Sequence, residues 1–256
     1  FHVKWRRCCF RARRATASVA AEGGGGGGAG CRGTACRLRP PAAREPESAP
    51  LAARPSAPSA CSAASLPAEG DRLSVPIDGH PTRFEDVPVS AWFACPVHGV
   101  LSNGIFDGYR DARGRPRGLY GPSDPITMGQ LAKIAVRLAK WDAPSLRAGE
   151  DWHAPFLRAA QSLELSAFAA DTDASAPTRR GVVLMTILEA LRIPVQPGPL
   201  PYADVSAESA DAPAIATATI LGIVSGDDGA ETFRPSDPVN RAEVAKIVMQ
   251  ALEGAQ

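Results

Sequence analysis

The side chains that could catalyse a reaction are few and scattered. The four histidines have no Cys or Asp partner at a catalytic or metal-binding spacing; they are His2, His80, His98 and His153. The sequence has no His-Glu-x-x-His, no Gly-x-Ser-x-Gly and no phosphate-binding loop, because no Lys-Ser/Thr follows the glycine run at residues 23–28. We therefore expect no enzymatic activity and no cofactor.

The cysteines and the loop acids do not predict a metal site. Five of the six cysteines precede residue 62, and only Cys95 lies beyond; the five are Cys8, Cys9, Cys31, Cys36 and Cys61. Cys31 and Cys36 have no His at a zinc-ligand spacing, so we expect no metal site. Cys95 is the single Cys of the part that we expect to be ordered and has no partner there, so we expect no disulfide framework. The loop acids Asp107, Asp111, Asp227 and Asp228 lack the alternating order and the closing Glu of a calcium loop. We expect these acids and their glycines to form turns.

The charge distribution divides the chain in two. Residues 1–70 hold eleven basic and four acidic side chains, and residues 71–256 hold 17 basic and 23 acidic ones. The first part is rich in Gly, Pro, Ala and Arg and cannot bury enough apolar area to offset its chain entropy. We predict a disordered, low-complexity basic arm over residues 1–71. Such an arm could attract nucleic acid, but we read it as a linker and expect no nucleic-acid partner. No apolar run is long enough to span a membrane.

The second part of the chain repeats itself. An aromatic-x-Asp-Val motif occurs twice, and Gly-Ile follows 18 residues after each Asp, at Gly104 and Gly222. An aromatic-x-Pro-Ser-Asp-Pro motif then precedes a helical pattern in both copies. The motifs are Phe84-Glu85-Asp86-Val87 and Tyr202-Ala203-Asp204-Val205, then Tyr120-Gly121-Pro122-Ser123-Asp124-Pro125 and Phe233-Arg234-Pro235-Ser236-Asp237-Pro238. A degenerate copy lies between them, so we predict repeats at residues 72–140, 141–196 and 197–256.

The helix that ends each repeat has the clearest local pattern. Thr127 with Gln130, and Asn240 with Glu243, form capping boxes in which side chain and backbone cap each other. Apolar residues follow with the period of one helix face; they are Leu131, Ile134, Ala135 and Leu138, then Val244, Ile247, Val248, Ala251 and Leu252. The middle helix begins at Thr178 and has Gly181 at the box position, so we expect weaker capping there.

These motifs resemble the S-layer homology domain family, which usually occurs as three tandem copies. The third copy is most similar, and Asn240-Arg241-Ala242-Glu243 resembles the family's Thr-Arg-Ala-Glu motif. The middle copy is degenerate and keeps Thr178-Arg179. The resemblance implies a mainly α fold, with three helix–loop–helix repeats in a pseudo-threefold bundle that follows the disordered arm.

The resemblance also implies a function at the bacterial cell surface. Such modules bind cell-wall polysaccharide, often an acidic or pyruvylated secondary wall polymer or a peptidoglycan-linked glycan, through grooves between repeats, and they anchor exported proteins without catalysis. We therefore expect an extracellular anchor whose partner is a wall glycan. The alternative is a structural surface-layer protein that self-associates through protein–protein contacts and binds no glycan. The missing motif Arg at Met128 and the eroded middle copy favour this alternative more than three intact copies would.

The resemblance assigns glycan binding to a set of residues near the helix starts. Arg241 and Arg179 fit a position where an Arg beside free helical N–H groups can bind a carboxylate, whereas Met128 cannot. Trp92 either stacks on a sugar ring or packs in the core, and we expect Trp152 to pack in the core. The remaining members of the predicted set are Asn240, Thr178, Gly108 and Gly226.

Overall fold

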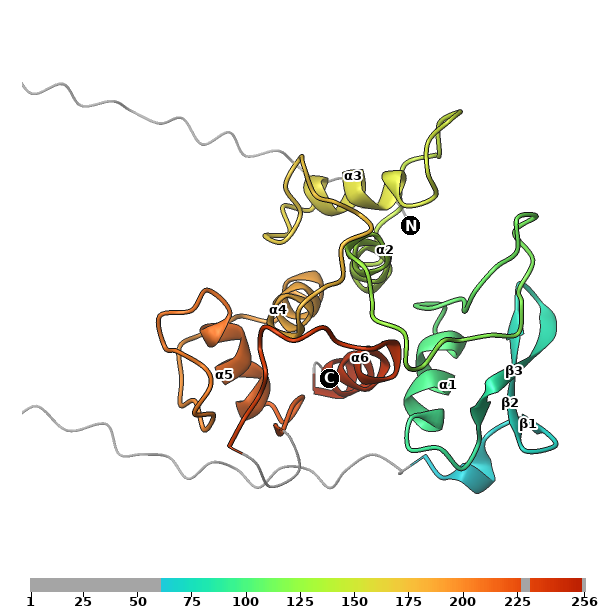
Figure 1. The fold of residues 1–256 in the computed structure, drawn as a ribbon, viewed down its shortest axis with the longest axis horizontal. Coiled ribbons are helices and arrows are strands. Elements are labelled where there is room, and N and C mark those ends of the chain that lie inside the picture. Colours follow the sequence, from blue (N-terminus) through green and yellow to red (C-terminus); the bar gives the residue numbers. More distant parts are fainter. Residues whose placement is uncertain (1–60, 227–230, 255–256) are drawn as a thin grey trace, which may run out of the picture. The chain divides into compact units, whose positions relative to one another are not determined.

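The computed structural model describes residues 61–226 and 231–254, so the predicted arm lies outside the described residues except for residues 61–71. Helices and a small sheet make up the described part (Figure 1). The elements are η1 (Ala63–Ser65), β1 (Ala68–Glu69), β2 (Arg72–Ile77), β3 (His80–Pro88), α1 (Ala94–Ser102), α2 (Met128–Leu138), α3 (Ala154–Ser162), α4 (Arg180–Ala190), α5 (Ala212–Ile220) and α6 (Arg241–Gly254).

The prediction of a mainly α fold built only from helix–loop–helix repeats is wrong, because β1, β2 and β3 form an antiparallel sheet. Leu73, Val75 and Ile77 alternate into the core with period two, as expected for a strand with one buried face. Asp78 and Gly79 both have positive φ and form the two-residue turn that joins β2 to β3. This alternation is visible in the sequence, but residues 72–140 were interpreted as a helix–loop–helix repeat, so no strand was predicted there.

The prediction of no disulfide is also wrong. Cys61 and Cys95 form a disulfide, with their Cα atoms 5.9 Å apart, that links the segment before η1 to the first turn of α1. The error came from assigning Cys61 to the arm, which left Cys95 without a partner. The structure instead places η1 and β1 within residues 61–71, and Leu66 is buried there.

The helices pack in pairs that join neighbouring predicted repeats rather than the two helices of one repeat. Short helices α1, α3 and α5 pack against α6, α2 and α4 respectively, and α4 also contacts both α2 and α6 (Figure 1). The sheet lies beside α1, which packs against β2. The predicted apolar faces of α2 and α6 are confirmed, since Leu131, Ile134, Val244 and Ile247 are buried.

Helices α2, α4 and α6 are joined at their N-termini by backbone hydrogen bonds between the segments that precede them. Ile126 N donates to Val239 O at 3.0 Å, and Thr178 N donates to Ile126 O at 2.9 Å. Arg180 N donates to Asp237 O at 2.9 Å. The first N–H groups of a helix have no partner within the helix, so each entry segment satisfies donors of another helix. We call this set of contacts the entry junction.

The capping predictions hold, with one shift of register. The boxes of Thr127 with Gln130 and of Asn240 with Glu243 are both present. In α4 the N-cap is Arg179, whose side chain makes no capping hydrogen bond, so the weaker cap is confirmed. The N-cap lies one residue later than predicted. Arg180, rather than Arg179, is therefore the first helical residue of α4, as Arg241 is of α6.

The aromatic-x-Asp-Val motif has the same task in both copies. Asp86 accepts hydrogen bonds from the backbone N–H groups of Tyr120 and Gly121, at 2.9 and 2.6 Å. Asp204 accepts them from Phe233 and the following residue, at 2.8 and 2.7 Å. Each carboxylate thus fixes the segment that leads into α2 or α6. The paired motifs recur because the entry junction needs both segments held in place.

The Gly of each Gly-Ile motif ends a helix in the left-handed conformation. Gly104 and Gly222 both have φ of +66°, and Glu164 occupies the corresponding position after α3 with φ of +56°. Glycine adopts this conformation without steric cost, whereas a residue with a Cβ pays roughly 1–2 kcal/mol. In the middle copy Glu164 stands in place of the motif Gly, and its backbone still adopts the left-handed conformation.

We predict that Gly104→Ala lowers the free energy of unfolding by about 1 kcal/mol. A Cβ at Gly104 would meet no atom within 4 Å, so the backbone conformation alone carries the effect. Urea denaturation followed by circular dichroism measures it, with Glu164→Ala as a control that changes stability by less than about 0.5 kcal/mol. Equal stability of Gly104→Ala and the unmodified protein would contradict this explanation of the motif.

We also predict that Cys61→Ser lowers the free energy of unfolding by about 2–4 kcal/mol, because the disulfide restricts the unfolded chain. The matched control is Ser62→Ala, since Ser62 is an exposed neighbour outside the disulfide. Thermal unfolding with and without reductant provides the measurement: reductant should lower the midpoint of the control and leave Cys61→Ser unchanged. A control midpoint that reductant does not move would show that the disulfide does not stabilise the fold.

Candidate functional site

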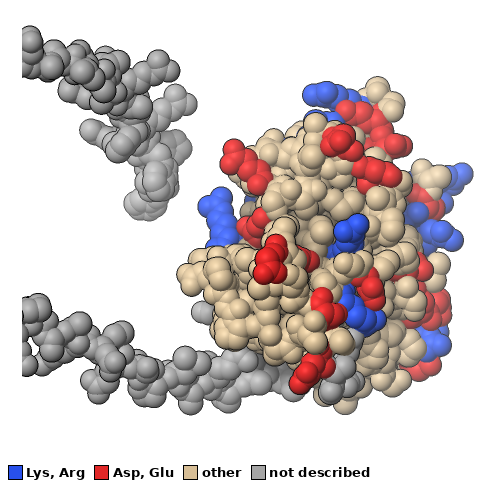
Figure 2. Space-filling view, turned by 60° about the vertical axis from the view of Figure 1, so that its left-hand side comes forward, with Lys and Arg blue, Asp and Glu red and all other residues tan. Residues whose placement is uncertain are grey.

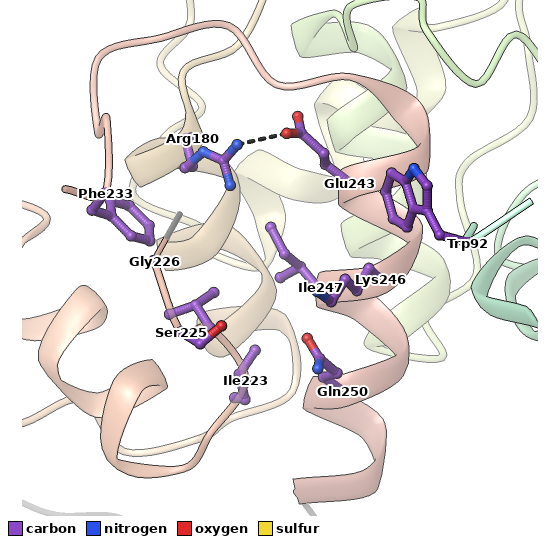
Figure 3. A pocket seen from close by; sticks show the side chains of 11 residues that line it. Trp92, Arg180, Ile223, Ser225, Gly226, Phe233, Glu243, Lys246, Ile247 and Gln250 are labelled. Atoms are coloured by element: carbon purple, nitrogen blue, oxygen red, sulfur yellow. Dashed lines mark hydrogen bonds and ion pairs between the residues drawn. The ribbon is translucent and has the colours of Figure 1, made fainter. Parts of the chain in front are cut away.

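A cavity of about 410 Å³ lies between the loop after α5, the N-terminal turns of α4 and one side of α6 (Figure 3). Arg180 and Glu243 face each other at one end, and Gln250 lies towards the other. Trp92, two residues before α1, also lines it. The full lining is Trp92, Arg180, Ile223, Val224, Ser225, Gly226, Phe233, Glu243, Lys246, Ile247 and Gln250.

Arg180 is the central polar group of this cavity. Its Nη2 donates to Glu243 Oε1 at 2.7 Å, and its guanidinium carbon lies 5.8 Å from the ring centroid of Phe233. Its Nε is buried and has no hydrogen-bond partner among the described residues. A buried N–H without a partner is costly, so a ligand oxygen that reached this nitrogen would gain a charge-assisted hydrogen bond.

The cavity also offers a free cation and an exposed aromatic ring. Lys246 is exposed and forms no ion pair within the part of the chain that the structure describes. Trp92 is 61% exposed, and its ring packs edge-on against Phe93. With Glu243 as the acidic group, Arg180 and Lys246 leave one net positive charge. The lining can therefore hold an acidic group beside an apolar ring face.

Arg241, the first residue in the predicted glycan-binding set, does not line the cavity. It is 5% exposed, and its Nε donates to Tyr120 O at 2.7 Å. Its guanidinium carbon lies 4.9 Å from the ring centroids of Tyr109 and Tyr120 and 5.2 Å from that of Phe106. In this structure Arg241 joins α6 to the segment before α2, and a glycan-binding role for it stays a prediction.

The other predicted residues fall into two groups. Trp92 and Gly226 line the cavity. Thr178 is buried in the entry junction, where its hydroxyl donates to Ile126 O at 3.2 Å, and Asn240 caps α6. Arg179 is exposed and does not line the cavity, unlike its neighbour Arg180.

Gly108 lies outside the cavity but adopts the same conformation as Gly226, with φ of +69° and +75°. A Cβ on either would fall within 2.8 Å of an aromatic side chain, Phe84 or Tyr202. These glycines therefore let the loop cross the motif aromatic. The prediction that Trp152 packs in the core is wrong, because it is 48% exposed.

Sequence analysis missed Arg180, Glu243 as its partner, Lys246 and Gln250. Arg180 was missed because Thr178 was aligned with the N-cap Thr127, which placed the start of the middle helix one residue too early. The bridges Thr127 to Pro177 and Arg179 to Pro238 show the correct register. A signal existed in the sequence, since Arg180 follows its N-cap directly, as Arg241 follows Asn240.

A second charged group joins the loop after α1 to α2. Asp107 Oδ1 is 2.6 Å from Arg137 Nη1, and Asp107 Oδ2 is 2.5 Å from Lys133 Nζ. We call Asp107, Lys133 and Arg137 the Asp107 cluster. Burial alone would raise the pKa of Asp107, but hydrogen bonds from Arg137 and Lys133 outweigh burial and hold that pKa below its ordinary value. Burial lowers the pKa of Lys133, partly offset by Asp107.

Comparison with known families assigns the C-terminal part of the chain. Residues 201–245 match the S-layer homology domain. This domain is in general a non-catalytic module that anchors proteins to the cell wall. The cavity residues from Ile223 to Glu243 lie inside the matched segment. The remaining ones lie outside it; they are Trp92, Arg180, Lys246, Ile247 and Gln250. No curated protein matches the chain.

None of the helices within residues 61–226 and 231–254 is long and apolar enough to cross a membrane. Within the same residues, no group of three or more His, Cys, Asp or Glu side chains could hold a metal ion. Asp111 instead accepts the backbone N–H groups of Arg113 and Arg115, as expected for a turn, and Asp227 and Asp228 lie outside the described residues.

The Asp107 cluster predicts a pH dependence. Because the folded pKa of Asp107 is lowered, the cluster stabilises the fold above the unfolded pKa of Asp, about 3.9, and this contribution is lost as pH falls through the folded value. Lys133, Arg137 and Arg110 face the carboxylate. We expect the difference in unfolding midpoint between the unmodified protein and Asp107→Asn to shrink as pH falls from 6 to 2. A constant difference would contradict the ion-pair explanation.

Proposed function

We propose that the cavity beside Trp92 binds an acidic cell-wall polysaccharide, and that the chain thereby serves as a non-catalytic anchor at the bacterial cell surface. The observation that carries this proposal is Arg180, whose buried Nε has no partner among the described residues while its Nη2 pairs with Glu243. The S-layer homology segment supports attachment to the wall. The disulfide of Cys61 supports an oxidising compartment.

The polar lining of the cavity supports an acidic sugar in particular. A guanidinium fork matches a carboxylate, Lys246 adds a second cation, and an exposed Trp92 ring offers a stacking surface. On the face shown in Figure 2, Lys and Arg side chains are interspersed with Asp and Glu. The described residues of that face therefore form no broad basic surface, and the proposed recognition of an acidic polymer rests on Arg180 and Lys246.

We also propose that residues 84–139 and 141–196 are diverged copies of the same domain. Asp86 and Asp204 hold equivalent segments, and the entry segments of α2, α4 and α6 hydrogen-bond to one another. In this interpretation the cavity is a site between copies. Trp92 comes from the first, Arg180 from the second and Lys246 from the third.

Co-sedimentation of the full chain with purified bacterial walls tests the proposal, using walls with and without their acid-strippable polymer. We predict binding to intact walls only. Arg180→Ala should weaken it by about 10- to 100-fold, the size of a lost charge-assisted hydrogen bond. Arg179→Ala, one residue away and exposed, is the matched control and should bind normally.

Lys246→Gln and Lys140→Gln form a second pair of test variant and control. Both lysines are exposed, but only Lys246 lines the cavity, so only its substitution should weaken wall binding. Circular dichroism confirms that each variant is folded. If the folded protein fails to sediment with intact walls, or sediments equally with stripped ones, the glycan proposal is wrong. If the chain instead self-associates and sediments without walls, a structural surface-layer role is favoured.

A further inference from the structure

We propose that the Asp107 cluster is a second acid-binding site of the same build as the cavity, which the chain fills with its own carboxylate. The native protein then binds one acidic sugar per chain, and removal of the Asp107 carboxylate opens a second site. This inference rests on the proposed function of the cavity, and the experiment below separates the two.

The cavity and the surroundings of the Asp107 cluster contain the same residue types at matching positions in the repeats. Lys246 lies six residues after the N-cap of α6, and Lys133 lies six residues after Thr127, the N-cap of α2. Trp92 lies two residues before α1, which packs on α6; Trp152 lies two residues before α3, which packs on α2. Each place therefore combines a lysine with a tryptophan from the helix packed against it.

The arginine–aromatic pairs beside the cavity and beside the Asp107 cluster also correspond. Arg180 is the first residue of α4 and lies over the Phe233 ring, and Arg241 is the first residue of α6 and lies over the Tyr120 ring. Each of these aromatic residues donates its own backbone N–H to a motif Asp, Phe233 to Asp204 and Tyr120 to Asp86. The shared arrangement thus extends from the lysine to the guanidinium–aromatic stack.

The decisive difference lies in the loop that follows each Gly-Ile motif. Ser225 lines the cavity two residues after Ile223, whereas Asp107 stands two residues after Ile105. The Asp107 carboxylate is 2.5 Å from Lys133 Nζ and within 3.1 Å of both Arg137 terminal nitrogens. In the cavity, Lys246 has no such partner among the described residues.

The internal carboxylate therefore marks where a ligand carboxylate would lie. Lys133 Nζ is also 5.8 Å from the Trp152 ring centroid and 5.6 Å from that of Phe156, so an acid bound there would have an aromatic surface beside it. Trp152 is 48% exposed, which leaves that ring available to a sugar. Without Asp107, Lys133 and Arg137 would lose their shared anion and attract another one.

Titration calorimetry on the full chain tests this inference, with a 4,6-O-pyruvyl hexosamine glycoside as the probe. We expect one site per native chain and two sites per chain of Asp107→Ser, the second weakened at least tenfold by a rise from 50 to 500 mM salt. Asp111→Ser is the matched control and keeps one site. In Asp107→Ser with Lys246→Gln, only the new site remains.

The outcomes separate the two proposals. One site in both the native chain and Asp107→Ser overturns the inference and leaves the proposed function standing. No site in the native chain but one in Asp107→Ser overturns the function of the cavity and supports the inference. No site in either overturns both. Should Asp107→Ser fail to fold by circular dichroism, Asp107→Asn keeps the side-chain shape, removes the charge and is titrated in its place.

Discussion

The entry junction is the constraint on which the rest of the structure depends. The first turns of α2, α4 and α6 leave backbone donors without partners inside their helices, and each set is satisfied by an entry segment elsewhere in the chain. The segments must then be held at a fixed distance and direction. Asp86 and Asp204 do so by accepting consecutive backbone N–H groups, which explains why the aromatic-x-Asp-Val motif and the aromatic-x-Pro-Ser-Asp-Pro motif occur together in both copies.

This junction also determines which side chains can meet a ligand. Because an entry segment from another part of the chain crosses each helix start, the first helical residue of α4 or α6 is placed against a foreign aromatic ring, Phe233 for Arg180 and Tyr120 for Arg241. The Arg241 guanidinium is enclosed and donates to Tyr120 O, while the buried Nε of Arg180, beside the cavity, has no partner among the described residues.

Much of the helical architecture could be predicted from the sequence, because capping boxes and apolar faces are local signals. The capping of α2 and α6 and the weak cap of α4 follow from three or four residues each. The disulfide was missed because Cys61 was assigned to the arm, and the sheet was missed because residues 72–88 were interpreted as part of a helical repeat. In the cavity, Trp92 and Gly226 were predicted, but Arg180 was not, because aligning Thr178 with Thr127 placed the N-cap of α4 one residue too early. Backbone pairing of Arg180 with Asp237 shows the actual register.

The most direct test of the account is a titration of the isotopically labelled full chain with the pyruvylated sugar, followed through the indole N–H signals of its tryptophans. The account predicts that the Trp92 signal moves on binding and that the Trp152 signal stays in place, since Asp107 already occupies the corresponding position. A shift of Trp152 without one of Trp92, or no shift of either at saturating sugar, would contradict it.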